Sequence, residues 1–175
     1  MFANTNLMYG VGYGYGRDLD VHNKGYEASV KLGFDEQVSR VIALNFLITE
    51  DYRVLLFNKG DVFSPGPLST EIGVNEGYSD AVLKAVKDSA LIITNECNVF
   101  KADNSFVAYD PTGSDEKVNI IPFYTSLPPW FHPDFDINLT GRENGYELLS
   151  IDEAERFLSE KGSPESQKAF ELITE

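Results

Sequence analysis

An amphipathic helix pattern at residues 78–88, which stands between two series of strand-like segments, constrains the fold more than any other feature. Its apolar residues recur at i, i+3, i+4, i+7 and i+8, and charged residues occupy the opposite face. The apolar residues are Tyr78, Ala81, Val82, Ala85 and Val86. Regular alternation of strands and helices builds a parallel sheet, and this chain lacks that alternation. We therefore expect an α+β fold, a mainly antiparallel β-sheet with about three helices packed on one face.

Two more helices are expected near the C-terminus. Ser150 is an N-cap with Glu153 three residues later, which together form a capping box for a helix that ends near Gly162. Its apolar stripe should be buried against the sheet and comprises Ile151, Ala154, Phe157 and Leu158. Ser163 followed by Pro164 starts the last helix in the same way.

Strands are expected where apolar and β-branched residues cluster or alternate. The segments are residues 26–32, 38–49, 52–57, 90–94, 97–101, 105–109 and 117–124. Turn residues between neighbours predict two hairpins, one joining 38–49 to 52–57 and one joining 97–101 to 105–109. Three prolines within residues 127–133 exclude regular structure there.

The 175 residues suit one domain spanning residues 1–175, in which residues 1–25 form an edge strand or an arm. Residues 9–16 alternate strictly between a large residue and glycine, which leaves one face of a strand bare for a close neighbour. The spacing of these glycines does not match a phosphate-binding loop.

The charge is strongly acidic, with 28 Asp and Glu against 14 Lys and Arg and a net charge of −14. Such a chain repels phosphate backbones and anionic membrane surfaces, so we expect no direct binding of nucleic acid or membrane. The same charge can attract a basic protein surface, which is the partner that we expect.

Cys97 is the only cysteine, so no disulfide can form within the chain and a reducing compartment is favoured. Neither a secretory signal nor an apolar run of about 18 residues is evident. We expect a cytoplasmic protein.

The two histidines each stand beside two aspartates at alternate positions. Side chains at i, i+2 and i+4 of an extended segment point to one side, so each triplet could offer two carboxylates and an imidazole to a divalent metal. The candidate ligands are Asp18, Asp20, His22, His132, Asp134 and Asp136. The alternative is that these acidic residues are simply solvated.

Trp130 and Phe131 lie in the proline-rich segment. Aromatic side chains on a stiffened loop lose little entropy on binding and are frequent binding hot spots, so both residues are candidate partner-binding residues. The alternative is that they cover the end of the core.

No nucleophile motif accompanies these features, so an enzyme is not the favoured interpretation. The leading hypothesis is a non-enzymatic acidic binding module without a cofactor, such as an inhibitor or an immunity-type neutraliser of a basic protein, the nucleic-acid-binding proteins included. A metal-dependent hydrolase that uses the two Asp/His triplets is one alternative. A structural or assembly subunit that adds its N-terminal strand to a neighbour is another.

Overall fold

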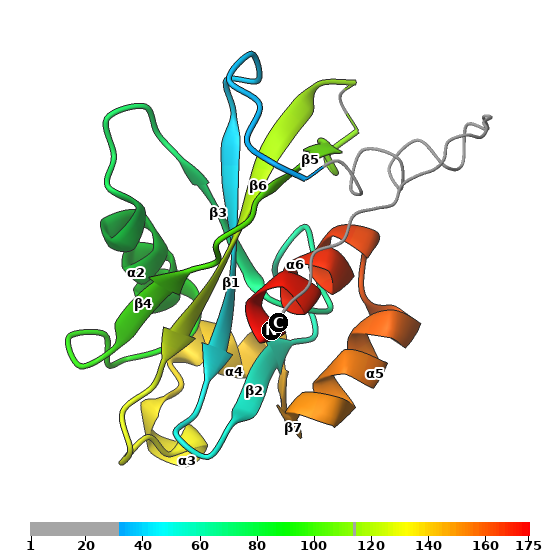
Figure 1. Ribbon diagram of the computed structural model, residues 1–175. Helices are drawn as coiled ribbons and strands as arrows, with labels where there is room; N and C mark the ends of the chain where they lie inside the picture. The colour runs from blue at the N-terminus through cyan, green and yellow to red at the C-terminus, as the bar shows by residue number, and fades with distance from the viewer. Residues whose placement is uncertain (1–31, 114) are drawn as a thin grey trace.

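The computed structural model describes residues 32–113 and 115–175, which form one mixed sheet and the helices that cover it (Figure 1). The sheet has seven strands in the order β4-β6-β1-β2-β7, with β3 paired to β1 and β5 paired to β6. The described part of the chain contains five helices, so the expected α+β class is confirmed.

Most of the strands are short. They are β1 (Val41–Ile48), β2 (Arg53–Phe57), β3 (Leu68–Ile72), β4 (Asn98–Lys101), β5 (Phe106–Tyr109), β6 (Lys117–Ser126) and β7 (Tyr146–Ser150). The helices are α2 (Tyr78–Ser89), α3 (Pro133–Asp136), α4 (Leu139–Asn144), α5 (Ile151–Lys161) and α6 (Pro164–Thr174).

β1 is the central strand and is buried on both faces. It runs parallel to β6 and antiparallel to β2 and β3. The predicted hairpin of β1 and β2 is confirmed, with Leu47 opposite Leu55. All other strand pairs within the described sheet are antiparallel, which agrees with the predicted sheet type.

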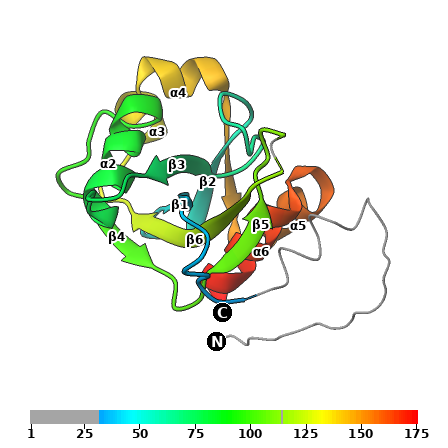
Figure 2. The same ribbon diagram turned by 90° about the horizontal axis from the view of Figure 1, so that it is seen from above.

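The helices cover both faces of the sheet, whereas we expected them on one. Leu44 and Phe46 of β1 share a core cluster with Phe170 of α6. Ala43, which points the other way along the same strand, shares a cluster with Val82 of α2. Figure 2 shows α2 on one side of the strands and α5 and α6 on the other.

The predicted caps are present. Ser150 and Glu153 form the full capping box of α5, and Ser163 caps α6 with a proline in its first turn. Leu158 of α5 is buried, but Phe157 is only half-buried, with Lys161 over its ring. The expected burial of the stripe is therefore correct for Leu158 and overstated for Phe157.

Several strand predictions were wrong. Residues 90–94 make only an isolated bridge, between Leu91 and Ile137, because the run follows α2 directly and packs against the segment entering α4. β4 and β5 do not form a hairpin with each other, since each pairs with β6. β3 and β7 were not predicted at all.

No described helix is long and apolar enough to cross a membrane.

Candidate functional site

The second Asp/His triplet lies at α3. The extended backbone that the prediction assumed is absent, because residues Pro133–Asp136 form a helical turn with His132 as its N-cap. The Asp134 N–H donates to His132 Nδ1 at 3.1 Å, and the His132 N–H donates to Asp136 Oδ2 at 2.7 Å. One imidazole nitrogen and one carboxylate are thus already used to cap this turn.

The first triplet, Asp18, Asp20 and His22, lies outside the described residues, as does the Tyr/Gly alternation of residues 9–16. Whether the two triplets meet is therefore not tested, and their metal-binding role stays a prediction. Within residues 32–113 and 115–175, no group of three or more His, Cys, Asp and Glu side chains could hold a metal ion.

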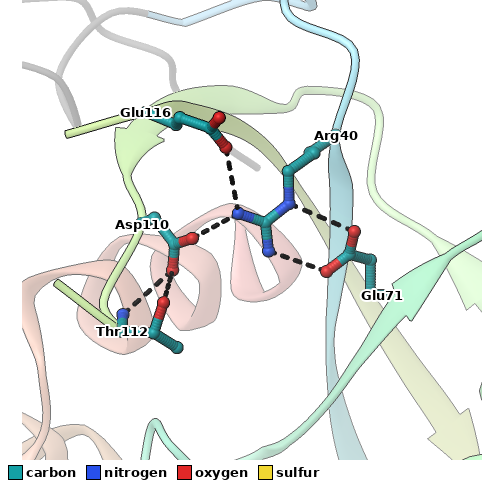
Figure 3. Close-up of polar contacts among 5 residues, drawn as sticks. All are labelled: Arg40, Glu71, Asp110, Thr112 and Glu116. Atoms are coloured by element: carbon teal, nitrogen blue, oxygen red, sulfur yellow. Dashed lines mark hydrogen bonds and ion pairs between the residues drawn. The ribbon is translucent and has the colours of Figure 1, made fainter. Parts of the chain in front are cut away.

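A cluster of polar side chains surrounds Arg40 at one end of the sheet (Figure 3). Arg40 immediately precedes β1, and its guanidinium makes a paired contact with Glu71 of β3, Nε to Oε2 at 3.1 Å and Nη2 to Oε1 at 2.7 Å. Nη1 donates to Asp110, which follows β5, and lies 3.5 Å from Oε1 of Glu116, which precedes β6. One side chain therefore joins four segments.

The carboxylate of Asp110 is the buried member of this cluster. It accepts hydrogen bonds from the backbone N–H and the hydroxyl of Thr112, at 2.9 and 2.7 Å. These bonds, together with that from Arg40, hold the pKa of Asp110 well below its usual range. The contacts with Glu71 and Asp110 raise the pKa of Arg40 further above its ordinary value.

A guanidinium bound to three carboxylates is a poor receptor for a phosphate group, because the negative charge around it opposes an anion. The Arg40 cluster therefore has a structural role, because it holds together the segments at this end of the sheet. Asn119 strengthens the same end, since its amide nitrogen donates to the carbonyls of Asp35 and Val38 at 3.1 and 3.0 Å. Sequence reasoning missed the cluster because Glu116 looks like a solvated turn charge, and nothing local links it to Arg40.

The two aromatic candidates differ in their surroundings. Trp130 is exposed, whereas Phe131 is half-buried and packs against the core cluster that contains Leu127 and Ile137. Phe131 thus anchors the loop and Trp130 remains accessible. Their role in partner binding stays a prediction.

The sequence matches no family model and no curated protein. The fold, however, is similar to solved structures. The chain is 16% identical to the dihydroneopterin triphosphate pyrophosphohydrolase of E. coli, with a TM-score of 0.58 over 77% of this chain and 96% of that one. It is 13% identical to a NUDIX hydrolase from Nitrosomonas europaea, with a TM-score of 0.51 over 77% and 88%.

A chain in the complex between the C-terminal domain of mouse MUTYH and human PCNA is also similar, at 12% identity and a TM-score of 0.54 over 78% and 88%. At these identities the likeness concerns the fold. The described domain thus has the fold of the NUDIX hydrolases.

These comparisons overturn the leading hypothesis from the sequence. The named enzymes that share the fold are hydrolases, which contradicts a non-enzymatic inhibitor or immunity-type neutraliser. The expectation of no cofactor is contradicted as well, because hydrolases of this kind depend on a divalent metal. The sequence reasoning failed because it sought a known local motif, whereas the likeness lies in the arrangement of strands and helices.

The described residues do not fit that metal. The three carboxylates that do converge, Glu71, Asp110 and Glu116, already surround the guanidinium of Arg40. The side chains at α3 do not provide three ligands at one point. No step of a reaction is therefore assigned to a metal held by the described part of the chain.

Proposed function

We propose that this protein is a hydrolase that cleaves a phosphoanhydride bond in a small organic triphosphate. The observation that supports this proposal is the fold, which it shares over most of its described length with a pyrophosphohydrolase of dihydroneopterin triphosphate. The sequence adds the two Asp/His triplets, whose carboxylates and imidazoles suit a divalent metal.

In the proposed reaction the oxygen of a water molecule forms a bond to one phosphorus atom. The bond between that phosphorus and the bridging oxygen breaks, and the leaving phosphate keeps the electron pair. The water gives up its proton, so two phosphate-containing products result from one triphosphate and one water. A divalent metal in such reactions neutralises phosphate charge and activates the water.

The test is hydrolysis by the purified full chain. Dihydroneopterin triphosphate and the common nucleoside triphosphates would be incubated with the protein and Mg²⁺ or Mn²⁺, and released phosphate and pyrophosphate measured. We expect release that depends on the metal and stops when it is chelated. Absence of release from every triphosphate with both metals would contradict the proposal.

The predicted ligands are tested in the same assay. Asp20→Asn is expected to lower the rate by at least about a hundredfold if Asp20 holds the metal, since loss of a ligand removes both orientation and charge. Asp103→Asn is the matched control, because Asp103 is an exposed residue between β4 and β5. Equal activity of both variants would refute the role of Asp20 while leaving the hydrolase proposal in place.

The cytoplasmic location expected from the sequence is also proposed here. It is supported by Cys97, the only cysteine, which is buried and has a pKa raised mainly by that burial. A buried thiol with a raised pKa is poorly reactive, which suits a cysteine that stays reduced. Localisation of a tagged full chain in its own cell would test it.

A further inference from the structure

Strand β5 lies at an edge of the described sheet. Among the residues that the structure describes, it forms a strand ladder with β6 alone. Its other edge carries an isolated antiparallel bridge, between Leu32 and Phe106, and the Gly33 N–H donates to the Ser105 carbonyl at 2.7 Å. Leu32 is the first residue of the described chain, which therefore begins on this edge, beside β5 in Figure 1.

The main-chain groups of β5 alternate between its two edges. At the end of the strand, the Asp110 N–H donates to the carbonyl of Glu116 at 2.9 Å, toward β6. In an antiparallel ladder the main-chain groups turn to the same neighbour at every second residue, so those of Val107 and Tyr109 point to the outer edge. An edge with main-chain groups in this arrangement accepts a further strand.

Residues 26–32 have the pattern of a strand with one buried face. Polar residues alternate there with apolar ones, which are Tyr26, Ala28, Val30 and Leu32. Leu32 packs against the core cluster that contains Phe106 and Ala108 of β5 and Phe170 of α6. Side chains at every second position share a face, so an extension of the bridge would place the other apolar residues on the same core. The residues on the opposite face would be Glu27, Ser29 and Lys31.

The bridge fixes the register of such an extension. Because Leu32 lies opposite Phe106 and the two segments are antiparallel, Val30 would lie opposite Ala108. The hydrogen bond next to the bridge flanks Leu32 and Phe106 and does not join them, so they form a non-hydrogen-bonded pair. Two residues further along, Val30 and Ala108 would be a pair of the same type, with Cα atoms about 4.5 Å apart.

We propose that residues 26–31 continue the bridge as a strand that pairs antiparallel with β5 of the same chain. The N-terminal segment suits this edge because it enters the described fold there, in the antiparallel direction, and with apolar residues at the positions that face the core. A strand at this place covers main-chain groups that would otherwise pair with another chain. Strand pairing of this kind goes beyond the proposed hydrolysis and does not depend on it.

The added strand would also separate the two Asp/His triplets. Residues before the strand leave the sheet at the end where Asp110 contacts Arg40. His22 is seven residues before Ser29, and seven residues span at most about 25 Å. His132 follows the opposite end of β6, a strand of 10 residues that is roughly 33 Å long. One metal ion shared by His22 and His132 is therefore not expected.

The register is tested in the wild-type full chain by nuclear magnetic resonance. Residues of a non-hydrogen-bonded pair bring their Hα atoms close together, so we expect a strong Hα–Hα Overhauser effect between Val30 and Ala108. The corresponding effect between Leu32 and Phe106 is the internal control, because that bridge belongs to the described structure. A spectrum with the second effect and without the first would overturn the proposal.

Cross-linking tests the same pairing and shows which copy of the chain supplies the strand. In a full chain with Cys97→Ala, the changes Val30→Cys and Ala108→Cys would place two thiols within disulfide range. Lys31→Cys with Ala108→Cys is the matched control, since residue 31 would point to the other face. We expect oxidation to link the first pair within one chain at least about tenfold faster than the second.

Equal rates for the two cysteine pairs would contradict the proposed register. Disulfide-linked dimers in place of an internal disulfide would assign the strand to a neighbouring copy and would equally contradict it.

The predicted burial of Val30 is tested by thermal unfolding of the full chain. Val30→Asp should lower the melting temperature by about 4 °C or more, because it replaces an apolar side chain on the core with a carboxylate. Ser29→Asp is the matched control on the opposite face and should shift the melting temperature by less than about 1 °C. Equal shifts for the two variants would show that residues 26–31 do not present one face to the core.

Discussion

Thr125 donates its hydroxyl hydrogen to Asn45 Oδ1 at 2.9 Å between the parallel strands β6 and β1, and both side chains are buried. The other half of the Asn45 amide, Nδ2, has no hydrogen-bond partner within the described residues. A buried donor without an acceptor is costly, because it has lost its bonds to water.

The pair predicts opposite effects for single and double substitutions. Thr125→Val removes the hydrogen bond to Asn45 Oδ1 and should lower the free energy of unfolding by about 1 to 3 kcal/mol. Combining it with Asn45→Leu should recover most of that loss, since no buried amide is left unpaired. Urea denaturation at neutral pH measures both, and Thr140→Val, at an exposed position of α4, is the control. A double variant no more stable than Thr125→Val would contradict this account.

The contacts of Asp110 in the Arg40 cluster predict that part of the protein's stability is lost at acid pH. Asp110→Asn should lower the free energy of unfolding by about 2 kcal/mol at pH 7, because a buried hydrogen-bonded carboxylate is lost. The pKa of Asp110 is lowered in the folded state, so its contribution is present above the ordinary carboxyl pKa and disappears as pH falls through the folded-state pKa. The difference between wild type and variant should therefore shrink below about pH 4.

A matched control for that prediction lies on α2, where Lys84 and Asp88 form an exposed ion pair at 3.3 Å. Asp88→Asn should cost less than about 0.5 kcal/mol at any of these pH values. Equal losses for the two variants would show that the Asp110 contacts contribute no more than a surface pair.

For Glu165 we expect the opposite dependence of stability on pH. This carboxyl group is buried at the start of α6, and burial raises its pKa. A raised pKa favours the folded state below the ordinary glutamate pKa and penalises it as pH rises through the folded-state pKa. Glu165→Gln should therefore raise the melting temperature at pH 8 and leave it unchanged near pH 4. Glu171→Gln, on the exposed side of the same helix, should show no such gain.

Packing on α5 predicts a clear ranking of two neighbouring residues. Leu158 is buried against the sheet, so Leu158→Ala should cost about 3 kcal/mol. Phe157 is only half-buried, and Phe157→Ala should cost roughly 1 to 2 kcal/mol, because less of its surface leaves water. Denaturation of the two variants in urea measures the ranking, and the reverse order would contradict the packing described for α5.

Features with a local cause were predictable from the sequence. The capping box at Ser150 and Glu153 fixes the start of α5, and helical spacing fixes α2, because both depend on residues within one or two turns. The hairpin of β1 and β2 is similarly local. The pairing of β4 and β5 with β6 depends on distant segments, which no local pattern specifies.

The candidate site was predictable to a smaller extent. His132 and Asp134 were identified by their residue types, but their alternate spacing has a different meaning in the helical turn that follows Pro133. Arg40 has no motif around it, and its carboxylate partners come from three separate segments. The exposure of Phe135 depends on how α3 and α4 lie beside α2, which sequence periodicity does not report.

The parallel pairing of β1 with β6 also bears on how the protein is made. β1 is synthesised early, whereas β6 follows only after β2, β3, α2, β4 and β5. Contacts between distant segments form late, because a long stretch of chain must first be closed into a loop. Until residue 126 leaves the ribosome, one edge of a strand that is buried on both faces in the finished protein lacks its neighbour. Such an unpaired apolar edge is prone to aggregate, so the nascent chain is expected to need chaperone protection during this interval.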